Sequence, residues 1–311
     1  MTTSSEKKST RALLLRGAGS VIAFGVVVYL VWQNWQDFLD ALQRISPDVL
    51  LGVLFLAFAS RLMVTVRWFI LLRVAEPNVT FWQVFRLSFV GLFTTNVLPS
   101  TIGGDVVKLG GAVQLGLDSA AVTASLVVDR LVGMGTMVTF LPFGVSRISE
   151  ATARALPMMA ASGSGTFFSQ FWHRLSGFMG RTWKSLKLWL QNPWQLVLAA
   201  FFSLIHMACT FTMVTGILSS LGDPISWWTA GGLWVLVYFI TLMPLSINGL
   251  GLQEASLSLM FTSFAGVAES NSLVLALLIR VLFMIASLPG AFFLPRLMAA
   301  NRDKQRLDEK D

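Results

Sequence analysis

The sequence predicts an all-α fold, a polytopic transmembrane helical bundle with two inverted repeats, each containing a broken or re-entrant segment. Three observations predict it. Of the 311 residues, 55% are hydrophobic and 13% are charged, whereas a soluble domain carries roughly 25% charged residues. Apolar stretches continue for about 20 residues, the length that a helix needs to cross a bilayer. Finally, a pattern of helix breakers, an acid and an arginine occurs once in each half of the chain.

The first element is expected to be an uncleaved helix that crosses the membrane. Residues 1–16 are polar and basic, and the apolar stretch up to Trp32 is followed by no evident small-residue cleavage site, which argues against a removed signal peptide. Basic residues collect on the cytoplasmic side of a membrane, so the amino terminus is expected there, on the evidence of Lys7, Lys8, Arg11 and Arg16. We therefore expect a multi-pass protein of the cytoplasmic or inner membrane.

Seven apolar stretches are long enough to span: 17–32, 49–72, 82–98, 120–145, 194–221, 228–245 and 273–294. Two shorter apolar segments, 103–116 and 251–265, directly follow the helix breakers and are short for a full crossing. We expect them to be half-helices or re-entrant segments. One integral membrane domain would then cover 1–311, with repeat 1 at about 49–146, repeat 2 at about 194–298 and a polar tail at 299–311.

The connection at about 147–193 is expected to be a cytoplasmic loop, because it contains several basic residues and the single acid Glu150. Between 168 and 189, apolar residues recur every three or four positions with basic residues among the polar ones. This pattern is typical of an amphipathic helix in the headgroup layer. The net charge of +7 therefore points to anionic lipid headgroups at the cytoplasmic interface as partners, and not to nucleic acid.

The repeated pattern is the main indication of a site. In the first half it consists of Asn96, Pro99, Gly103, Gly104, Asp105 and Arg130, and in the second half of Pro244, Asn248, Gly249, Gly251, Glu254 and Arg280. The acid and the arginine are 25 residues apart in one copy and 26 in the other. Breakers beside an acid at corresponding positions of two halves are typical of transporter sites at mid-membrane depth.

Charged residues inside apolar stretches need partners, since each costs on the order of 2.5–3.5 kcal/mol on insertion scales. We expect Arg67 and Arg86 to reach the interface by snorkelling, because both lie near predicted span ends. Arg61, Arg130 and Arg280 lie deeper and must face a partner, a water-filled space or a ligand.

Two interpretations of the acid–arginine pattern remain open, and they are compatible, since arginines partly neutralised by acids still offer donors to a phosphate. The first is internal ion pairing, Asp105 with Arg130 and Glu254 with Arg280. The second is an electropositive cavity that binds an anionic headgroup, to which the amino termini of the short helices would add N–H donors. Capping of those amino termini would by itself also explain both acids.

Other kinds of chemistry have no support in the sequence. Gly249-Leu250-Gly251 is not followed by the Gly-Lys-Ser/Thr of a phosphate loop, and no nucleophile elbow or zinc motif occurs. The two histidines are far apart, and the single cysteine, Cys209, lies in an apolar run. We therefore expect no metal and no cofactor, and we do not expect an enzyme.

On these residues the chain resembles the lysylphosphatidylglycerol synthase transmembrane family, also called flippase-like or UPF0104 membrane proteins. The resemblance rests on Asn96-x-Leu98-Pro99-Ser100-x-x-Gly103-Gly104-Asp105, Asp129-Arg130, and Pro244 with Asn248-Gly249-Leu250-Gly251 and Glu254. It implies an inverted-repeat helical fold with re-entrant segments and movement of lipid between leaflets. The aminoacyl transfer of fused members is not implied, because no long polar region remains beside the predicted spans.

The function expected is therefore a flippase-like lipid transporter. Arg130 and Arg280 would hold the phosphate of a phospholipid or related polar lipid, with Arg61 as a further candidate. The helix starts at Gly104 and Gly251 would add donors. Asp105 and Glu254 would orient the arginines or bind a positive moiety of the headgroup. Pro99 and Pro244 would break the helices so that backbone groups line the cavity. The alternatives are an integral membrane lipid-modifying transferase or an accessory subunit or scaffold of a lipid-synthesis complex. A homo-oligomer and association with lipid-synthesis enzymes are both compatible with the sequence.

Overall fold

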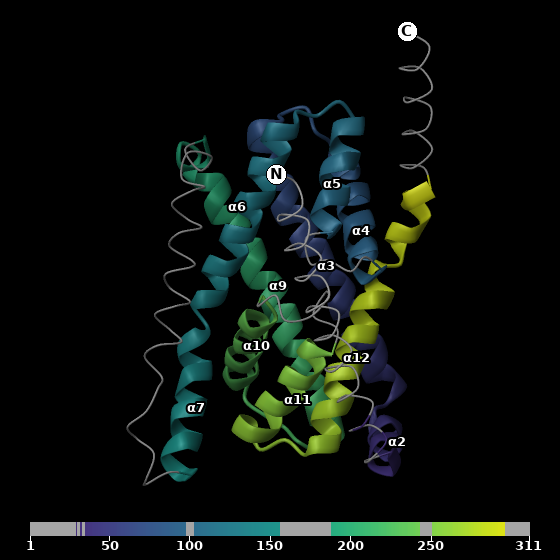
Figure 1. Ribbon diagram of the computed structural model, residues 1–311, viewed down its shortest axis with the longest axis vertical. Coiled ribbons are helices and arrows are strands. Elements are labelled where there is room, and N and C mark those ends of the chain that lie inside the picture. Colours follow the sequence, from purple (N-terminus) through teal and green to yellow (C-terminus); the bar gives the residue numbers. More distant parts are fainter. Residues whose placement is uncertain are drawn as a thin grey trace, which may run out of the picture.

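The computed structural model describes residues 29, 32, 35–97, 103–155, 188–242 and 251–295, and every regular element in these ranges is a helix (Figure 1). In chain order the helices labelled in Figure 1 are α2 (Trp35–Arg44), α3 (Pro47–Ala75), α4 (Phe81–Val97), α5 (Gly103–Gln114), α6 (Ser119–Val138), α7 (Leu141–Ala155), α9 (Pro193–Leu221), α10 (Trp227–Thr241), α11 (Leu252–Ala265) and α12 (Glu269–Ser287). The predicted all-α class is confirmed. The first predicted span and the polar tail fall almost wholly outside the described residues.

Four of the described helices are long and apolar enough to cross a membrane: α3, α6, α9 and α12. They coincide with four of the seven predicted spans. Two other predicted spans, 82–98 and 228–245, correspond to α4 and α10, which have 17 and 15 residues in the described part of the chain. Both helices are short for a crossing of about 20 residues. The chain is thus a multi-pass helical membrane protein.

The short helices form two pairs at opposite ends of the bundle. Figure 1 shows α4 and α5 in the upper half of the view and α10 and α11 in the lower half. Within each pair the two helices pack on each other. Because α3 leads up to α4 and α9 leads down to α10, α3 and α9 run in opposite directions, and they pack along each other.

Corresponding helices of the two halves have similar lengths. α3 and α9 both contain 29 residues and both begin with a proline. Proline suits the first turn of a helix because the N–H it lacks would have no partner there. α6 and α12 contain 20 and 19 residues. The order long, short, short, long therefore occurs twice.

Helix ends follow local capping rules. Ser46 accepts from Val49 N at the start of α3, Asp118 from Ala121 N at α6, and Ser226 from Thr229 N at α10. At α4, Thr80 and Gln83 form a reciprocal capping box. α9 ends at Gly222, whose φ of 91° is a left-handed conformation that glycine adopts readily. These caps occur at the loop ends of helices, where backbone groups lack partners within the helix.

The predicted span 120–145 differs from the structure. The helix breaks after Val138, and α7 begins at Leu141 with Pro142 in its first turn, where the missing proline N–H is tolerated. α7 then extends to Ala155, into the region that we assigned to the loop at 147–193. The predicted amphipathic helix lies mostly within 156–187, outside the described residues, and stays a prediction.

The two described ends of that connection lie at different places in the bundle. Trp189, just before α9, donates its indole N–H to the carbonyl of Leu71 near the end of α3. By contrast, Gly144 of α7 touches Gly232 in the first half of α10. Figure 1 places the end of α7 low and the start of α9 high in the view.

Glycines allow close helix contacts in both halves. A Cβ on Gly104 of α5 would lie 2.1 Å from Thr95 Oγ1 and 2.5 Å from the carbonyl oxygen of Gly91 on α4. A Cβ on Gly232 would lie 2.2 Å from the backbone nitrogen of Gly144. Small residues let backbones approach in this way, which is the main device of helix packing in lipid. α4 is thereby held against α5, and α7 against α10.

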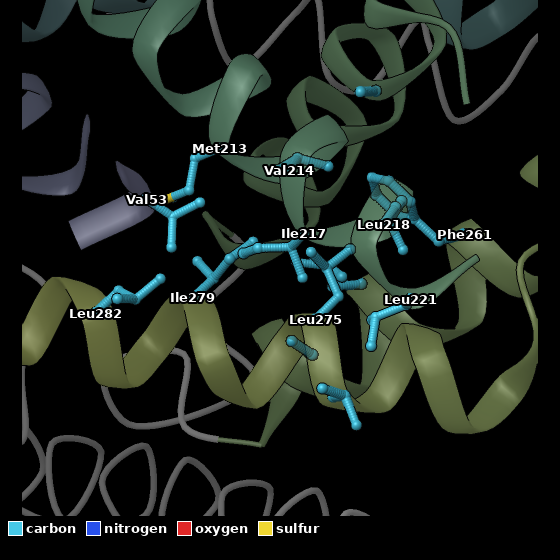
Figure 2. Packing of buried hydrophobic residues seen from close by; sticks show 14 of the residues in the cluster. Val53, Met213, Val214, Ile217, Leu218, Leu221, Phe261, Leu275, Ile279 and Leu282 are labelled. Carbon is cyan, nitrogen blue, oxygen red and sulfur yellow. The ribbon is translucent and has the colours of Figure 1, made fainter. Parts of the chain in front are cut away.

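The largest apolar cluster joins α3, α9, α10, α11 and α12. Figure 2 shows Val53 of α3 and Ile217 of α9 packed with Phe261 of α11 and Leu275 and Ile279 of α12. Phe261, Ile217, Leu275 and Ile279 are fully buried. This cluster fixes α12 against α9, and with it the position of Arg280.

Candidate functional site

The first acid–arginine pair joins α5 to α6. Asp105 is the third residue of α5, and Arg130 donates from Nε to Asp105 Oδ2 over 2.7 Å. Lys108, one turn further along α5, has its Nζ 3.6 Å from the other carboxylate oxygen. Lys108 is buried and also lies over the ring of Trp68. Asp105 thus has two cations beside it.

The second pair joins α11 to α12. Glu254 is the third residue of α11, and its carboxylate forms an ion pair with Arg280. Glu254 is 3% exposed, so its charge depends on this partner. Buried ionised carboxylates require a partner because transfer out of water is costly. Gly251, just before α11, has a φ of 75°, which requires glycine.

The two pairs occupy equivalent positions in their helices. Each acid is the third residue of a short helix. Each arginine is the twelfth residue of the long helix that follows, counting from Ser119 in α6 and from Glu269 in α12. Internal pairing, the first of the two open interpretations, is confirmed for both copies.

Asp129 and Arg130 are adjacent in sequence but have different partners. Consecutive residues of an α-helix point about 100° apart, so the two side chains reach different neighbours. Arg67 of α3 donates from Nε to Asp129 Oδ1 at 2.7 Å and from a terminal nitrogen to Oδ2 at 2.8 Å. α6 is therefore tied to α3 through Asp129 and to α5 through Arg130.

The prediction that Arg67 snorkels to the interface is wrong. Its side chain is 9% exposed and forms the bidentate pair with Asp129. The sequence was misleading because Arg67 lies within a span that continues to Ala75, three residues beyond the predicted end. Arg86 is partly buried, donates weakly to the carbonyl of Trp82 and lies over its ring.

A set of hydroxyl-bearing residues around Arg67 was not anticipated. Ser203 of α9 accepts from Arg67 at 3.2 Å and lies 2.6 Å from the hydroxyl of Thr136. A second polar contact joins α3 to α9, where the hydroxyl of Ser60 lies 2.7 Å from His206 Nδ1. Serine and threonine inside apolar stretches were the available signal, since such side chains commonly hydrogen-bond between helices in membranes.

Each pair of short helices, α4–α5 and α10–α11, also contacts the opposite half of the chain. Asn96 near the end of α4 donates to Ser287 Oγ at the end of α12, over 2.7 Å. Tyr238 near the end of α10 lies close enough to interact electrostatically with Arg130 and Arg67. The hydrogen bond between Asn96 and Ser287 therefore joins the two halves of the chain.

Arg61 lies on α3, apart from the ion pairs. Its guanidinium carbon is 3.9 Å above the centre of the Phe283 ring on α12.

The short helix predicted after the first breaker does begin at Gly103, and both Gly103 and Gly104 are buried there. Pro99, Pro244, Asn248 and Gly249 lie outside the described residues, so their predicted roles stay predictions.

Comparison with known proteins gives one family. No curated protein matches the sequence. The family described as "Lysylphosphatidylglycerol synthase TM region" matches residues 17–290, which includes both acid–arginine pairs and all the helices from α2 to α12. The chain therefore belongs to the lysylphosphatidylglycerol synthase transmembrane-region family.

Proposed function

We propose that the protein moves a phospholipid or related polar lipid between leaflets, with the headgroup held at mid-membrane depth by the two acid–arginine pairs. The observation that carries the proposal is the repetition of one arrangement, a short helix whose third residue pairs with the twelfth residue of the next long helix. Ionisable groups inside a membrane domain mark ligand pathways by default. Membership of the family is consistent with a lipid cargo.

The proposal includes two inverted repeats. One would contain α3 to α6 and the other α9 to α12. The opposite directions of α3 and α9, the matched helix lengths, and the placement of α4–α5 and α10–α11 at opposite ends support it. In this arrangement the short helices are re-entrant pairs that approach the bilayer centre from opposite sides, the geometry of many secondary transporters.

In the proposed mechanism the arginines provide the phosphate-binding groups. A guanidinium has five N–H donors in a planar fork, and a single carboxylate does not use all of them. Arg130 and Arg280 would exchange part of their contact with Asp105 and Glu254 for a phosphate, and the acids would hold the arginines in place between transport events. The first turns of α5 and α11 would add backbone N–H donors.

The test follows labelled lipid across the leaflets of liposomes that contain the purified full chain. Arg130→Ala and Arg280→Ala are expected to slow translocation at least tenfold relative to the parent, because each removes charge-assisted hydrogen bonds. Arg73→Ala is the matched control, because Arg73 is an exposed arginine in the last turn of α3. If both site variants move lipid as fast as the parent, the assigned roles are wrong.

A further inference from the structure

We infer that Arg61 is a third phosphate-binding residue, and that the site selects lipids whose headgroup carries a net negative phosphodiester. This inference rests on the proposed function and specifies its substrate class. It starts from the depth of Arg61, which is residue 15 of the 29 in α3. At 1.5 Å per residue its Cα is about 21 Å from either end of the helix, and a side chain cannot extend so far to reach the interface.

Arg61 differs from the other deep arginines in its partners. Among the residues that the structure describes, no carboxylate forms an ion pair with Arg61, and its buried Nε has no hydrogen-bond partner. Arg67, Arg130 and Arg280, by contrast, each pair with an acid. A guanidinium at this depth without a carboxylate needs an anion from elsewhere.

The contact with Phe283 fits a ligand-binding arginine. The guanidinium carbon lies 3.9 Å above the ring centre, and this cation–π contact holds the guanidinium in place. The fork of N–H groups at its edge is then left for bidentate bonds to a phosphate. Phe283 follows Arg280 by three residues on α12, so the two lie on neighbouring positions of one helix face. The contact therefore places Arg61 against the helix that carries Arg280.

The charge of the whole set favours an anionic headgroup. The deep charged side chains in the described helices are the cations Arg61, Arg67, Lys108, Arg130 and Arg280 and the carboxylates Asp105, Asp129 and Glu254. Cations outnumber carboxylates by two. A headgroup with net negative charge would compensate this excess, whereas a zwitterionic headgroup would leave it in place. His206, which lies near Arg61, adds no negative charge.

The experiment measures binding to the full chain in detergent by native mass spectrometry. The probes are short-chain phosphatidylglycerol, which is anionic, short-chain phosphatidylcholine, which is zwitterionic, and inorganic phosphate. The parent is expected to bind phosphatidylglycerol more tightly than phosphatidylcholine. Arg61→Gln is expected to weaken phosphatidylglycerol binding about tenfold or more. Arg61→Lys keeps the charge but loses the fork, so a several-fold weakening is expected.

Arg86→Gln is the matched control, because Arg86 also lies over an aromatic ring but near the start of α4. This variant should bind phosphatidylglycerol as tightly as the parent does. Equal affinity of the parent and either Arg61 variant for phosphatidylglycerol overturns the inference. Arg61→Lys decides the question if Arg61→Gln does not fold. Inorganic phosphate that binds as tightly as the lipid would identify the ligand as free phosphate and overturn the lipid assignment.

The outcomes separate this inference from the proposed function. Liposomes with parent protein that move lipid, together with Arg61 variants that bind and move it equally well, would refute only the role of Arg61. Arg61-dependent binding of phosphatidylglycerol without movement of any lipid would refute the proposed function and leave the binding site.

Discussion

Arg67 on α3 and Asp129 on α6 form a bidentate ion pair with both side chains 9% exposed. The pair joins two helices that are both long enough to cross a membrane. Asp129 is adjacent to Arg130 in sequence. A change in the position of α6 would therefore displace the Arg67–Asp129 pair and the Asp105–Arg130 pair together.

We predict that Asp129→Ala destabilises the protein by about 3–5 kcal/mol, because it leaves the buried guanidinium of Arg67 without its carboxylate. The free energy of unfolding, measured by denaturation in mixed micelles, checks this value. As a control, Asp40→Ala at an exposed aspartate of α2 should change the free energy of unfolding little. Replacement of both partners, Arg67→Met with Asp129→Leu, should recover most of the loss. An Asp129→Ala protein as stable as the parent would show that the pair does not hold α3 and α6 together.

The contact between α4 and α5 gives a second prediction. Gly104→Ala should destabilise the protein and reduce lipid translocation, because the new Cβ meets the backbone of Gly91 and moves Asp105 away from Arg130. Gly110→Ala in the same helix is the control, since nothing lies within 4 Å of a Cβ there. Thermal unfolding in detergent compares the two variants. A contradiction would be equal melting temperatures for Gly104→Ala and Gly110→Ala.

A third prediction concerns the inverted arrangement. The turn between α3 and α4 and the turn between α9 and α10 should lie on opposite sides of the membrane. In a Cys209→Ser background, Asn78→Cys and Pro224→Cys introduce thiols at exposed positions of these two turns. An impermeant thiol reagent added to intact cells should label one of them, and permeabilised cells should show labelling of both. Labelling of both positions in intact cells would rule out the inverted repeats.

The Glu254–Arg280 pair separates a structural role from a transport role. Glu254→Gln is expected to lower stability by about 2 kcal/mol, because Arg280 loses a charge-assisted bond. The double variant Glu254→Gln with Arg280→Gln should regain stability, since no unpaired charge remains, but it should not regain translocation. Unfolding and translocation are measured on the same preparations. Recovery of both quantities in the double variant would mean that the pair is only a brace.

Much of the fold could be predicted from hydropathy, since α3, α6, α9 and α12 each lie within or close to a predicted span. The acid–arginine partners were also predictable from the repeated spacing. The break after Val138 was not, because the apolar run continues past Pro142 to Val145 and reads as one span. The partner of Asp129 was also missed. Arg67 is 62 residues away, and only the packing of α3 against α6 brings the two together.

The central claim is that the chain moves lipid across a bilayer, and one measurement tests it most directly. Fluorescent phosphatidylglycerol is placed in both leaflets of liposomes with and without the full chain, and an impermeant quencher is added outside. We predict that the protein makes the inner-leaflet probe accessible, so that quenching proceeds to completion, and that Arg130→Ala with Arg280→Ala abolishes this effect. Quenching that stops at the outer leaflet in both kinds of liposome would contradict the account.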